Sequence, residues 1–181
     1  MHKAVFLDRD GTINEDAGYI CSADKLIFIP LAIRALRILQ ERFQLFIITN
    51  QSGIGKNIFS EEDFIQFNSY FNSILKNNGI NIKHIYYCPH TKEDNCICHK
   101  PSTYYLKRAK DEHNIDLLNS YIVGDHPHDI EMAKKVGAKS VYLLTGHGEK
   151  HRNELVIKPE FIAADLYKAT IWIMENDAKN Y

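Results

Sequence analysis

Short continuous apolar runs alternate along the chain with longer segments in which apolar residues recur every three or four positions. The runs are rich in Val, Ile, Tyr and Phe, and their apolar residues follow one another instead of alternating with polar ones. Strands buried on both faces of a parallel sheet have this pattern. We therefore expect strands at residues 4–8, 44–49, 84–88, 121–125, 140–145 and, as the shortest run, 161–164.

Helical patterns fill the spaces between these runs. The segment 60–79 begins with Ser60, has Asp63 three positions later as in a capping box, and ends at Gly79. Strands that alternate with helices predict an α/β fold with a doubly wound parallel sheet, and the length of the chain predicts one domain over residues 1–181. The other expected helices cover residues 31–43, 102–114, 128–137 and 165–176.

Composition narrows the class of protein. The 181 residues carry a net charge of -1, 45% are hydrophobic and 25% are charged, as in ordinary soluble domains. No basic cluster stands out, which argues against a nucleic-acid partner. The first apolar run is too short for a signal peptide, and Pro30 interrupts a run that is far too short for a membrane span. We expect a cytoplasmic protein, a monomer or small homo-oligomer, with a small-molecule partner.

Polar side chains stand at the carboxyl ends of four of the expected strands. They are Asp8, Thr49, Cys88 and Asp125. Ligands of open parallel sheets bind beyond the carboxyl ends of the strands. We therefore expect these four residues to border one site.

The segment "VFLDRDGT" places two carboxylates, Asp8 and Asp10, directly after the first strand. Carboxylates this close resist ionisation unless a cation neutralises them, and Mg²⁺ with oxygen ligands suits them. Asp125 would complete such a cage. An aspartate can also attack a phosphoryl group, while a second acid protonates the leaving alcohol. The alternative is a structural acid pair in a turn.

Two other segments offer phosphate-binding groups. "ITNQSGIGK" supplies the Thr49 hydroxyl and a small polar loop. Lys100, just before an expected helix, can neutralise charge on a transferring phosphoryl group. Asp129, four residues after Asp125, would either orient that loop or open the helix that follows.

A cysteine-rich loop precedes Lys100. Cys88, His90, Cys96 and Cys98 have the spacing C-x-H-x5-C-x-C, a closed ligand set typical of structural Zn²⁺. The alternative is a set of reduced thiols with a chance histidine. His99 is a second candidate ligand, although the close Cys96–Cys98 pair favours a substrate-facing role for it. Cys21 lies outside the set and is expected to be a free thiol.

The motifs "DRDGT", "ITN", "HKP" and "GDHPHD", in this order, resemble the four motifs of the haloacid dehalogenase (HAD)-like phosphohydrolases. The resemblance covers almost the whole chain. It implies a Rossmann-like HAD fold, Asp8 as the nucleophile and Asp10 as the general acid and base. It further implies that Thr49 and Lys100 bind phosphate, and that Mg²⁺ is held by Asp8, Asp125 and the backbone carbonyl of Asp10. The chain has no insertion large enough for a cap domain, so a capless member is expected.

A zinc loop in a capless member is similar to two enzyme families, the D-glycero-D-manno-heptose 1,7-bisphosphate 7-phosphatases and the histidinol phosphatases. "DRDGTINEDAGYI" and "TNQSGIGK" are more like the first, although His99 stands where that family usually has arginine. Glu15 and Asp16 would be partners for the amine of histidinol phosphate. A phosphosugar-binding protein without turnover is a third alternative.

The substrate would be a small phosphorylated metabolite. We expect His126, His128, His147 and His151 to be ordinary loop residues, with a substrate role as the alternative. Lys56 and Lys100 are further cations near the site. The expected substrate-binding residues are Arg9, Asn50, Gln51, Ser52 and His99.

Overall fold

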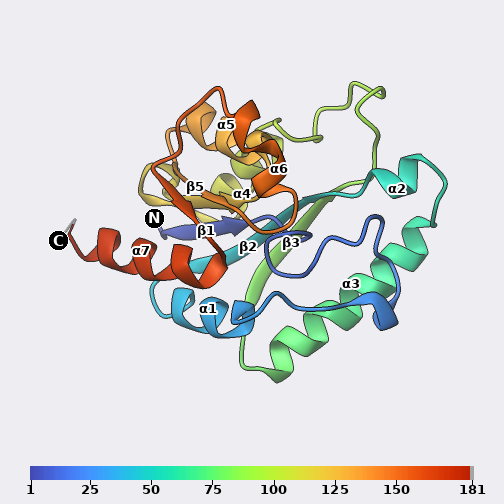
Figure 1. The fold of residues 1–181 in the computed structure, drawn as a ribbon, viewed down its shortest axis with the longest axis horizontal. Helices are drawn as coiled ribbons and strands as arrows, with labels where there is room; N and C mark the ends of the chain where they lie inside the picture. Colours follow the sequence, from blue (N-terminus) through green and yellow to red (C-terminus); the bar gives the residue numbers. More distant parts are fainter. Residues whose placement is uncertain (180–181) are drawn as a thin grey trace.

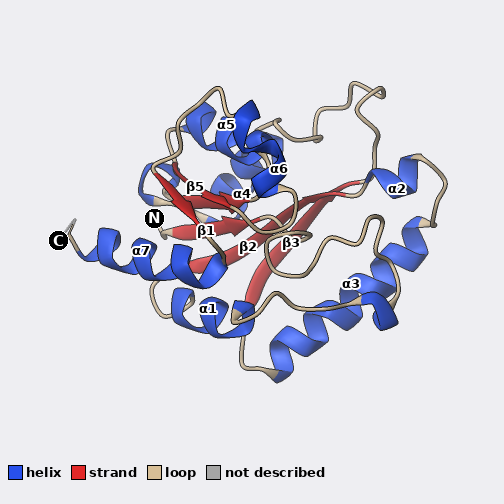
Figure 2. Ribbon diagram, in the orientation of Figure 1, coloured by secondary structure: helices blue, strands red, loops and turns tan. Residues whose placement is uncertain are grey.

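The computed structural model describes residues 1–179. Six parallel strands form one sheet in the order β3-β2-β1-β4-β5-β6 (Figure 1; Figure 2). The expected doubly wound parallel sheet is therefore confirmed. The strands are β1 (Ala4–Leu7), β2 (Gln44–Asn50), β3 (Ile82–Cys88), β4 (Tyr121–Gly124), β5 (Lys139–Leu143) and β6 (Phe161–Ala163).

Helices cover both faces of the sheet. On one face lie α1 (Ala32–Leu39), α3 (Glu61–Asn77) and α7 (Leu166–Ala178), and on the other lie α4 (Tyr104–His113) and α5 (Pro127–Val136) (Figure 1). Each face has its own core, because alternate strand residues point to opposite sides. Val5 and Leu7 pack under the first layer, while Ala4 and Phe6 pack under the second.

Aromatic packing stabilises the second core. Phe6 stacks on Phe46 at 5.1 Å between ring centroids, and Phe46 stacks on Tyr86 at 6.4 Å. The three rings come from β1, β2 and β3, so they join neighbouring strands on one face. Such contacts add to the gain from burying the rings.

The expected capping box of α3 is confirmed. The Asp63 backbone N–H donates to Ser60 Oγ, and the Ser60 N–H donates to the Asp63 carboxylate. Two helices of four residues each, α2 (Ser52–Gly55) and α6 (Gly148–His151), were not expected. Segments this short are below the length at which an apolar repeat can be recognised. Three 3-10 turns, at residues 23–25, 117–119 and 152–154, were not predicted for the same reason.

The order in which the chain adds strands to the sheet reverses between β1 and β4. From β1 the chain continues to β2 on one side, whereas from β4 it continues to β5 on the other. A crevice forms where the order reverses in this way, at the carboxyl ends of the strands. The connection from β1 to α1 contains one 3-10 turn and no inserted domain within residues 1–179, as expected for a capless protein. None of the helices in this range combines the length and the apolar character that crossing a membrane requires.

Candidate active site

A cavity of about 470 Å³ lies at the carboxyl ends of the central strands. Asp8 follows β1, Thr49 lies near the end of β2, and Asp125 follows β4. All three line the cavity together with Lys100, which comes from the connection between β3 and α4. The structure therefore brings together Asp8, Thr49 and Asp125 as expected, and adds Lys100. The fourth strand-end residue, Cys88, is absent from the lining and lies in the cysteine cluster instead.

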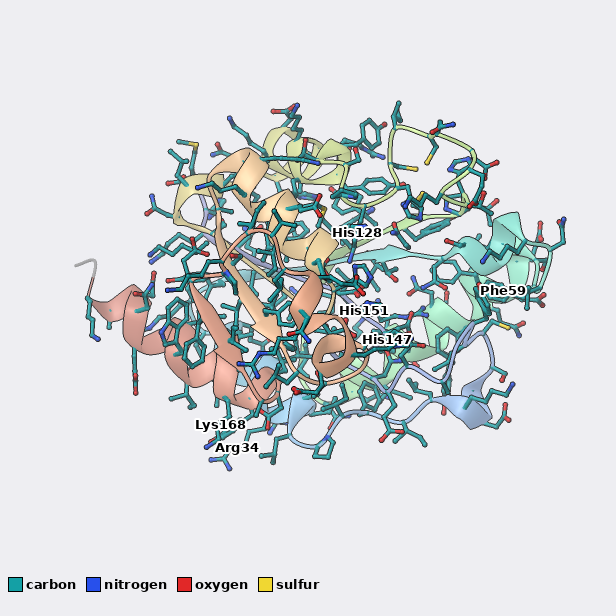
Figure 3. All side chains as sticks on the ribbon, turned by 45° about the horizontal axis from the view of Figure 1, so that its top comes forward. Arg34, Phe59, His128, His147, His151 and Lys168 are labelled. Carbon is teal, nitrogen blue, oxygen red and sulfur yellow. The ribbon has the colours of Figure 1, made fainter. Side chains whose placement is uncertain are left out.

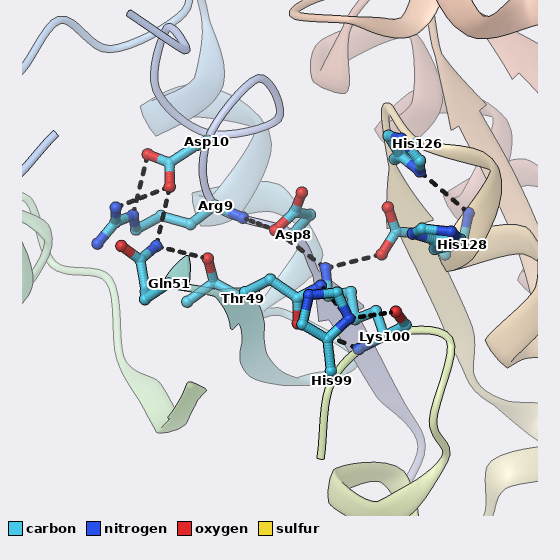
Figure 4. Close-up of polar contacts among 11 residues, drawn as sticks. Asp8, Arg9, Asp10, Thr49, Gln51, His99, Lys100, His126 and His128 are labelled. Atoms are coloured by element: carbon cyan, nitrogen blue, oxygen red, sulfur yellow. Dashed lines mark hydrogen bonds and ion pairs between the residues drawn. The ribbon is translucent and has the colours of Figure 1, made fainter. Parts of the chain in front are cut away.

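An acidic cluster with one lysine forms the centre of the site (Figure 4). Asp8, Asp125 and Asp129 each offer a carboxylate oxygen, and these oxygens lie within 4.8 Å of one another. Lys100 Nζ lies 3.0 Å from Asp8 Oδ1 and 2.8 Å from Asp129 Oδ1. Asp129 lies in the first turn of α5, as one of the two alternatives for it requires, and its carboxylate contacts Lys100.

The cluster carries more negative charge than its lysine compensates. Burial raises the pKa of Asp8 to about 6, against the pull of Lys100. Burial and then the charge of Asp8 raise the pKa of Asp125 to about 8. Asp129 Oδ2 is buried and has no hydrogen-bond partner within residues 1–179. Three oxygen ligands with unbalanced charge fit a hard divalent cation such as Mg²⁺.

Lys100 is held as an ammonium group. Its burial opposes the charged form, but the charges of Asp129 and Asp8 outweigh that effect and raise the pKa of Lys100. Its backbone N–H donates to Asn50 Oδ1 at 3.1 Å, which ties the residue to the end of β2. A buried, fixed cation of this kind is suited to negative charge that develops on a phosphoryl group.

A loop that the sequence did not assign also reaches the acidic cluster. The His147 backbone N–H donates to Asp125 Oδ2 at 2.8 Å, and Thr145 Oγ1 donates to the Gly11 carbonyl at 2.6 Å. Gly11 has φ of +81°, and a Cβ there would lie 2.2 Å from Asp125 Oδ2. The pair of glycines around His147 in the sequence is the signal that indicates such a tight turn.

Asp10 lies on the cavity lining and accepts hydrogen bonds on both oxygens (Figure 4). The donors are Arg9, Asn14 and Gln51. We expected Arg9 to bind substrate, and the structure places it elsewhere. Its side chain is fully buried, forms an ion pair with Asp10, and is absent from the cavity lining.

The other expected substrate-binding residues border the cavity. Thr49 Oγ1 accepts a hydrogen bond from Gln51 Nε2 at 2.9 Å, and Thr49 is almost fully buried. His99 Nδ1 lies 2.8 Å from the Lys100 carbonyl. The residues of this group on the lining are Asn50, Gln51, Ser52 and His99.

Histidines form part of the cavity wall, contrary to our expectation of ordinary loop residues. Three of the four, His126, His128 and His147, line the cavity. The ring centroid of His151 lies 5.0 Å from that of His126 and 5.8 Å from that of His147. Figure 3 shows His128, His147 and His151 near one another. The sequence could not place them, because their approach depends on how the β4–α5 and β5–α6 connections pack together.

Two histidines of the cavity wall, His126 and His128, favour the neutral form. Burial lowers the pKa of His128 to about 4, with neighbouring His126 adding to the effect, so its ring is neutral at pH 7. Burial also lowers the pKa of His126. His147 Nε2 lies 3.1 Å from Asp16 Oδ2, which joins the loop after β1 to the loop after β5. Lys56, which also lines the cavity, donates to the Tyr19 hydroxyl at 2.7 Å.

The cysteine loop forms a second cluster that could hold a metal ion. Ligand atoms of Cys88, His90, Cys96 and Cys98 lie within 4.8 Å of one another. The sulfur–sulfur distances are 3.1 Å, 3.5 Å and 3.6 Å. Four ligands around Zn²⁺ with Zn–S bonds of about 2.3 Å would place the sulfurs about 3.8 Å apart, so the set fits a tetrahedral ion. Cys21 lies outside this cluster and is a free cysteine, as expected.

Comparison with known proteins places the chain in a family. Residues 97–169 match a family model described as HAD-hydrolase-like. The D-glycero-beta-D-manno-heptose-1,7-bisphosphate 7-phosphatase of Pasteurella multocida is 37% identical over 98% of this chain and 94% of that protein. The D-glycero-D-manno-heptose-1,7-bisphosphate 7-phosphatase of Chlorobaculum tepidum is 36% identical over 92% of each.

A solved structure agrees with these relatives. The D,D-heptose 1,7-bisphosphate phosphatase of B. bronchiseptica, crystallised with magnesium and phosphate, has a TM-score of 0.88 and 26% identity. It covers 96% of this chain, and this chain covers 99% of it. Family model, relatives and fold agree with the motifs at the strand ends. The chain belongs to the D-glycero-D-manno-heptose-1,7-bisphosphate 7-phosphatase family of HAD-like phosphatases.

Proposed function

We propose that this protein removes the 7-phosphate of D-glycero-D-manno-heptose 1,7-bisphosphate through an aspartyl-phosphate intermediate. The observation that carries the proposal is the Asp8–Lys100 pair on the cavity lining, where Asp8 Oδ1 and Lys100 Nζ are 3.0 Å apart. The pair supplies a nucleophile and a fixed cation for the transferred group. The named relatives supply the choice of sugar.

In the first step a carboxylate oxygen of Asp8 forms a bond to phosphorus. The bond between phosphorus and the ester oxygen breaks, and its electron pair stays with that oxygen, which takes a proton from Asp10. Lys100 offsets negative charge on the phosphoryl oxygens, and the Thr49 hydroxyl donates to one of them. Asp10 lies on the same cavity lining as Asp8, where it can reach the leaving group.

In the second step water attacks the phosphorus of the aspartyl-phosphate. Asp10, now a carboxylate, accepts a proton from the water, and the bond between phosphorus and Asp8 breaks. Phosphate leaves and Asp8 returns to its starting form. The sum of the two steps is one ester and one water converted to one alcohol and one phosphate.

Asp8, Asp125 and the backbone carbonyl of Asp10 would hold Mg²⁺. The ion would neutralise the acidic cluster and polarise the phosphoryl group. The raised pKa values of Asp8 and Asp125 support this, because they reflect charge that no residue of the cluster balances. Asp129 stands beside these ligands, with one oxygen 2.8 Å from Lys100.

We also propose that Cys88, His90, Cys96 and Cys98 bind structural Zn²⁺. All four positions of a tetrahedral ion would be filled by protein, as in sites that order a loop and carry no chemistry. The loop ends two residues before Lys100, so the ion would help to position that lysine. Metal ligation by reduced thiols suits the cytoplasm, where we place the protein, in the synthesis of lipopolysaccharide heptose.

The substrate would occupy the cavity with its 7-phosphate at Asp8. Asn50, Gln51, Ser52 and His99 border that position. The His99 ring stands where the family's usual arginine would supply a permanent charge, so it offers a titratable group instead. We propose that Lys56 and this ring face the second phosphate, and that a single domain over residues 1–181 suffices for the reaction.

The experiment that tests the proposal compares kcat/KM for heptose 1,7-bisphosphate and histidinol phosphate with Mg²⁺. We expect a preference of about a hundredfold for the bisphosphate, or about 2.7 kcal/mol of transition-state discrimination. A preference for histidinol phosphate would overturn the choice of substrate. Failure to hydrolyse either compound, or any aryl phosphate, would overturn the phosphatase reaction itself.

A further inference from the structure

The Asp10 carboxylate is held by more hydrogen bonds than an acid that only ends a strand would need. Arg9 Nε donates to its Oδ1 at 3.1 Å, and Arg9 Nη2 donates to its Oδ2 at 2.7 Å. Asn14 Nδ2 donates to Oδ1 at 2.9 Å, and Gln51 Nε2 donates to Oδ2 at 3.0 Å. Each oxygen therefore accepts two hydrogen bonds, and turning the carboxylate would break four. Figure 4 shows those from Arg9 and Gln51.

Arg9 itself is an unusual residue for an interior. Its exposed fraction is 0%, and its guanidinium lies 5.5 Å from the Phe64 ring centroid and 5.1 Å from that of Phe67. Nη1 is buried and has no hydrogen-bond partner within residues 1–179. Burying a guanidinium with one nitrogen unpaired costs stability. Removing its ion-pair partner, the Asp10 carboxylate, would cost more, because the buried charge would then be uncompensated. Packing alone would be served by an apolar side chain.

From these contacts we propose that Arg9 is a positioning residue that acts through Asp10. Its planar pair of N–H groups fixes the plane of the carboxylate, and the two rings fix the plane of the guanidinium. Asp10 is thereby held on the cavity lining, where its Oδ2 exchanges the hydrogen bond from the neutral Gln51 amide for the proton that it delivers to the leaving oxygen or takes from water. The inference rests on the proposed function, because that function makes Asp10 the general acid and base.

The effects on the two chemical steps distinguish a positioning role of Arg9 from a merely structural one. A sugar alkoxide needs a proton as it leaves, whereas a nitrophenolate leaves well without one. Hydrolysis of the aspartyl-phosphate needs a base with either substrate. A displaced Asp10 should therefore slow the first step for the sugar, spare the first step for the aryl phosphate, and slow the second step for both.

The experiment uses the full chain with Arg9→Met, whose unbranched stem still fits between Phe64 and Phe67. Rapid-mixing kinetics with p-nitrophenyl phosphate should give a burst of nitrophenolate at close to the wild-type rate, followed by slow turnover. The kcat for heptose bisphosphate should fall roughly 10²-fold, the usual effect of a misplaced catalytic group, with KM little changed. Arg9→Lys keeps the positive charge and loses the planar pair of N–H groups, so its kcat should lie between those of the wild type and Arg9→Met.

Arg108→Met is the matched control. Arg108 also donates two N–H groups to a carboxylate, that of Glu112, and lies 5.6 Å from the Tyr86 ring, but it stands outside the cavity. Its kinetics should equal those of the wild type. If Arg9→Met fails to fold, Asn14→Ala provides the test. It should slow the first step for the sugar and spare it for the aryl phosphate in the same way, but by a smaller factor.

Two results would overturn the inference. One is an equal loss on both substrates in the first step, which would mean that Arg9 only supports the fold. The other is wild-type kinetics for both Arg9 variants. Failure of the proposed function has a different signature, which is retained turnover in Asp8→Asn. The two ideas therefore fail by separate measurements.

Discussion

At the scale of single residues, the chemistry of the site follows from charge that is buried and only partly balanced. Asp8, Asp125 and Asp129 share one ammonium group, that of Lys100, and burial holds the pKa of two of the acids near 6 and 8. A divalent cation would relieve this repulsion. The same arrangement therefore favours metal binding and keeps the proposed nucleophile, Asp8, beside the ammonium group of Lys100.

Replacing the proposed nucleophile, Asp8, tests both its chemical role and its contribution to the charge of the cluster. Asp8→Asn should lower kcat by more than about 10³-fold, because an amide cannot form the aspartyl-phosphate. The variant should melt no lower than the wild type near neutral pH without added Mg²⁺, since it removes one charge from a crowded cluster. Steady-state phosphate release and thermal melting check the two parts. Asp24→Asn, an exposed acid outside the cavity, is the control.

Gly11 offers a second test at this scale. Gly11→Ala would place a methyl group 2.2 Å from Asp125 Oδ2 on a backbone with φ of +81°. We expect Mg²⁺ to activate the variant only at a concentration at least about tenfold higher, because the methyl group would displace one of its ligands; a tenfold change corresponds to about 1.4 kcal/mol. Activity measured against Mg²⁺ concentration provides the check.

Gly79→Ala separates this clash from backbone strain. Gly79 has φ of +74°, but a Cβ there would meet nothing within 4 Å. It should cost about 1–2 kcal/mol of stability through the left-handed backbone and leave the Mg²⁺ dependence unchanged. Equal Mg²⁺ profiles for the two variants would contradict the contact with Asp125.

At the scale of elements, loops rather than strands complete the site. The connection from β3 to α4 carries both the cysteine cluster and Lys100. It is tied to the end of β2, because the Gln51 N–H donates to the Cys88 carbonyl at 2.7 Å and the Lys100 N–H donates to Asn50. Its polar middle section cannot form a core, so a metal ion would be its main source of order.

Cys96→Ser should therefore lower the bound zinc and the rate together. We expect a loss of stability of several kcal/mol, since the binding energy of a structural zinc site contributes to folding. The kcat should fall as Lys100 loses its support. Metal analysis of the purified protein, thermal melting and phosphate release would measure this. Cys21→Ser is the control, and a Cys96 variant with full zinc content and full rate would contradict the structural zinc site.

At the scale of the whole molecule, the reversal of strand order between β1 and β4 decides where the site lies. β1 and β4 are neighbours in the sheet, with Leu7 paired to Val123, so Asp8 and Asp125 emerge side by side. Helices on both faces bury the strands and leave only their carboxyl ends open to the cavity. The acids are thereby gathered by the fold at a cost that must appear in its stability.

That cost predicts how stability varies with pH. Without added Mg²⁺, the pKa values of Asp8 and Asp125 in the folded state, about 6 and 8, lie above the ordinary value of 3.8. These shifts make the folded state bind more protons than the unfolded state, while the lowered pKa of His128 has the opposite effect below about pH 6.5. The free energy of unfolding should therefore fall as pH rises between about pH 6.5 and pH 8, where Asp125 titrates. Melting temperatures measured across this range should fall accordingly, and Mg²⁺ should flatten the fall.

Asp125→Asn should flatten the same profile without Mg²⁺, because it removes the acid with the larger shift. Sodium chloride at matched ionic strength controls for simple screening. A metal-free protein whose stability rises with pH over this range would contradict the charge imbalance of the cluster.

Much of the fold and of the site was predictable from local patterns. The strand-end positions of Asp8, Thr49 and Asp125 followed from where each apolar run stops, and the cysteine cluster followed from its spacing. The role of Arg9 did not follow, since an arginine beside two acids looks the same in sequence whether it faces solvent or an interior. The histidines of the cavity wall were missed for a similar reason.

The sequence by itself determined the order of strands and helices, the residues at the strand ends and the ligands available for metals. It could do so because apolar periodicity and short-range spacing are local properties of the chain. Only the tertiary structure decided that Arg9 is buried against Asp10, that Lys100 meets Asp129, and that the loop at residues 145–148 contacts Asp125. Those contacts join segments that packing brings together, and the partner of a buried charge is set by whatever surrounds it.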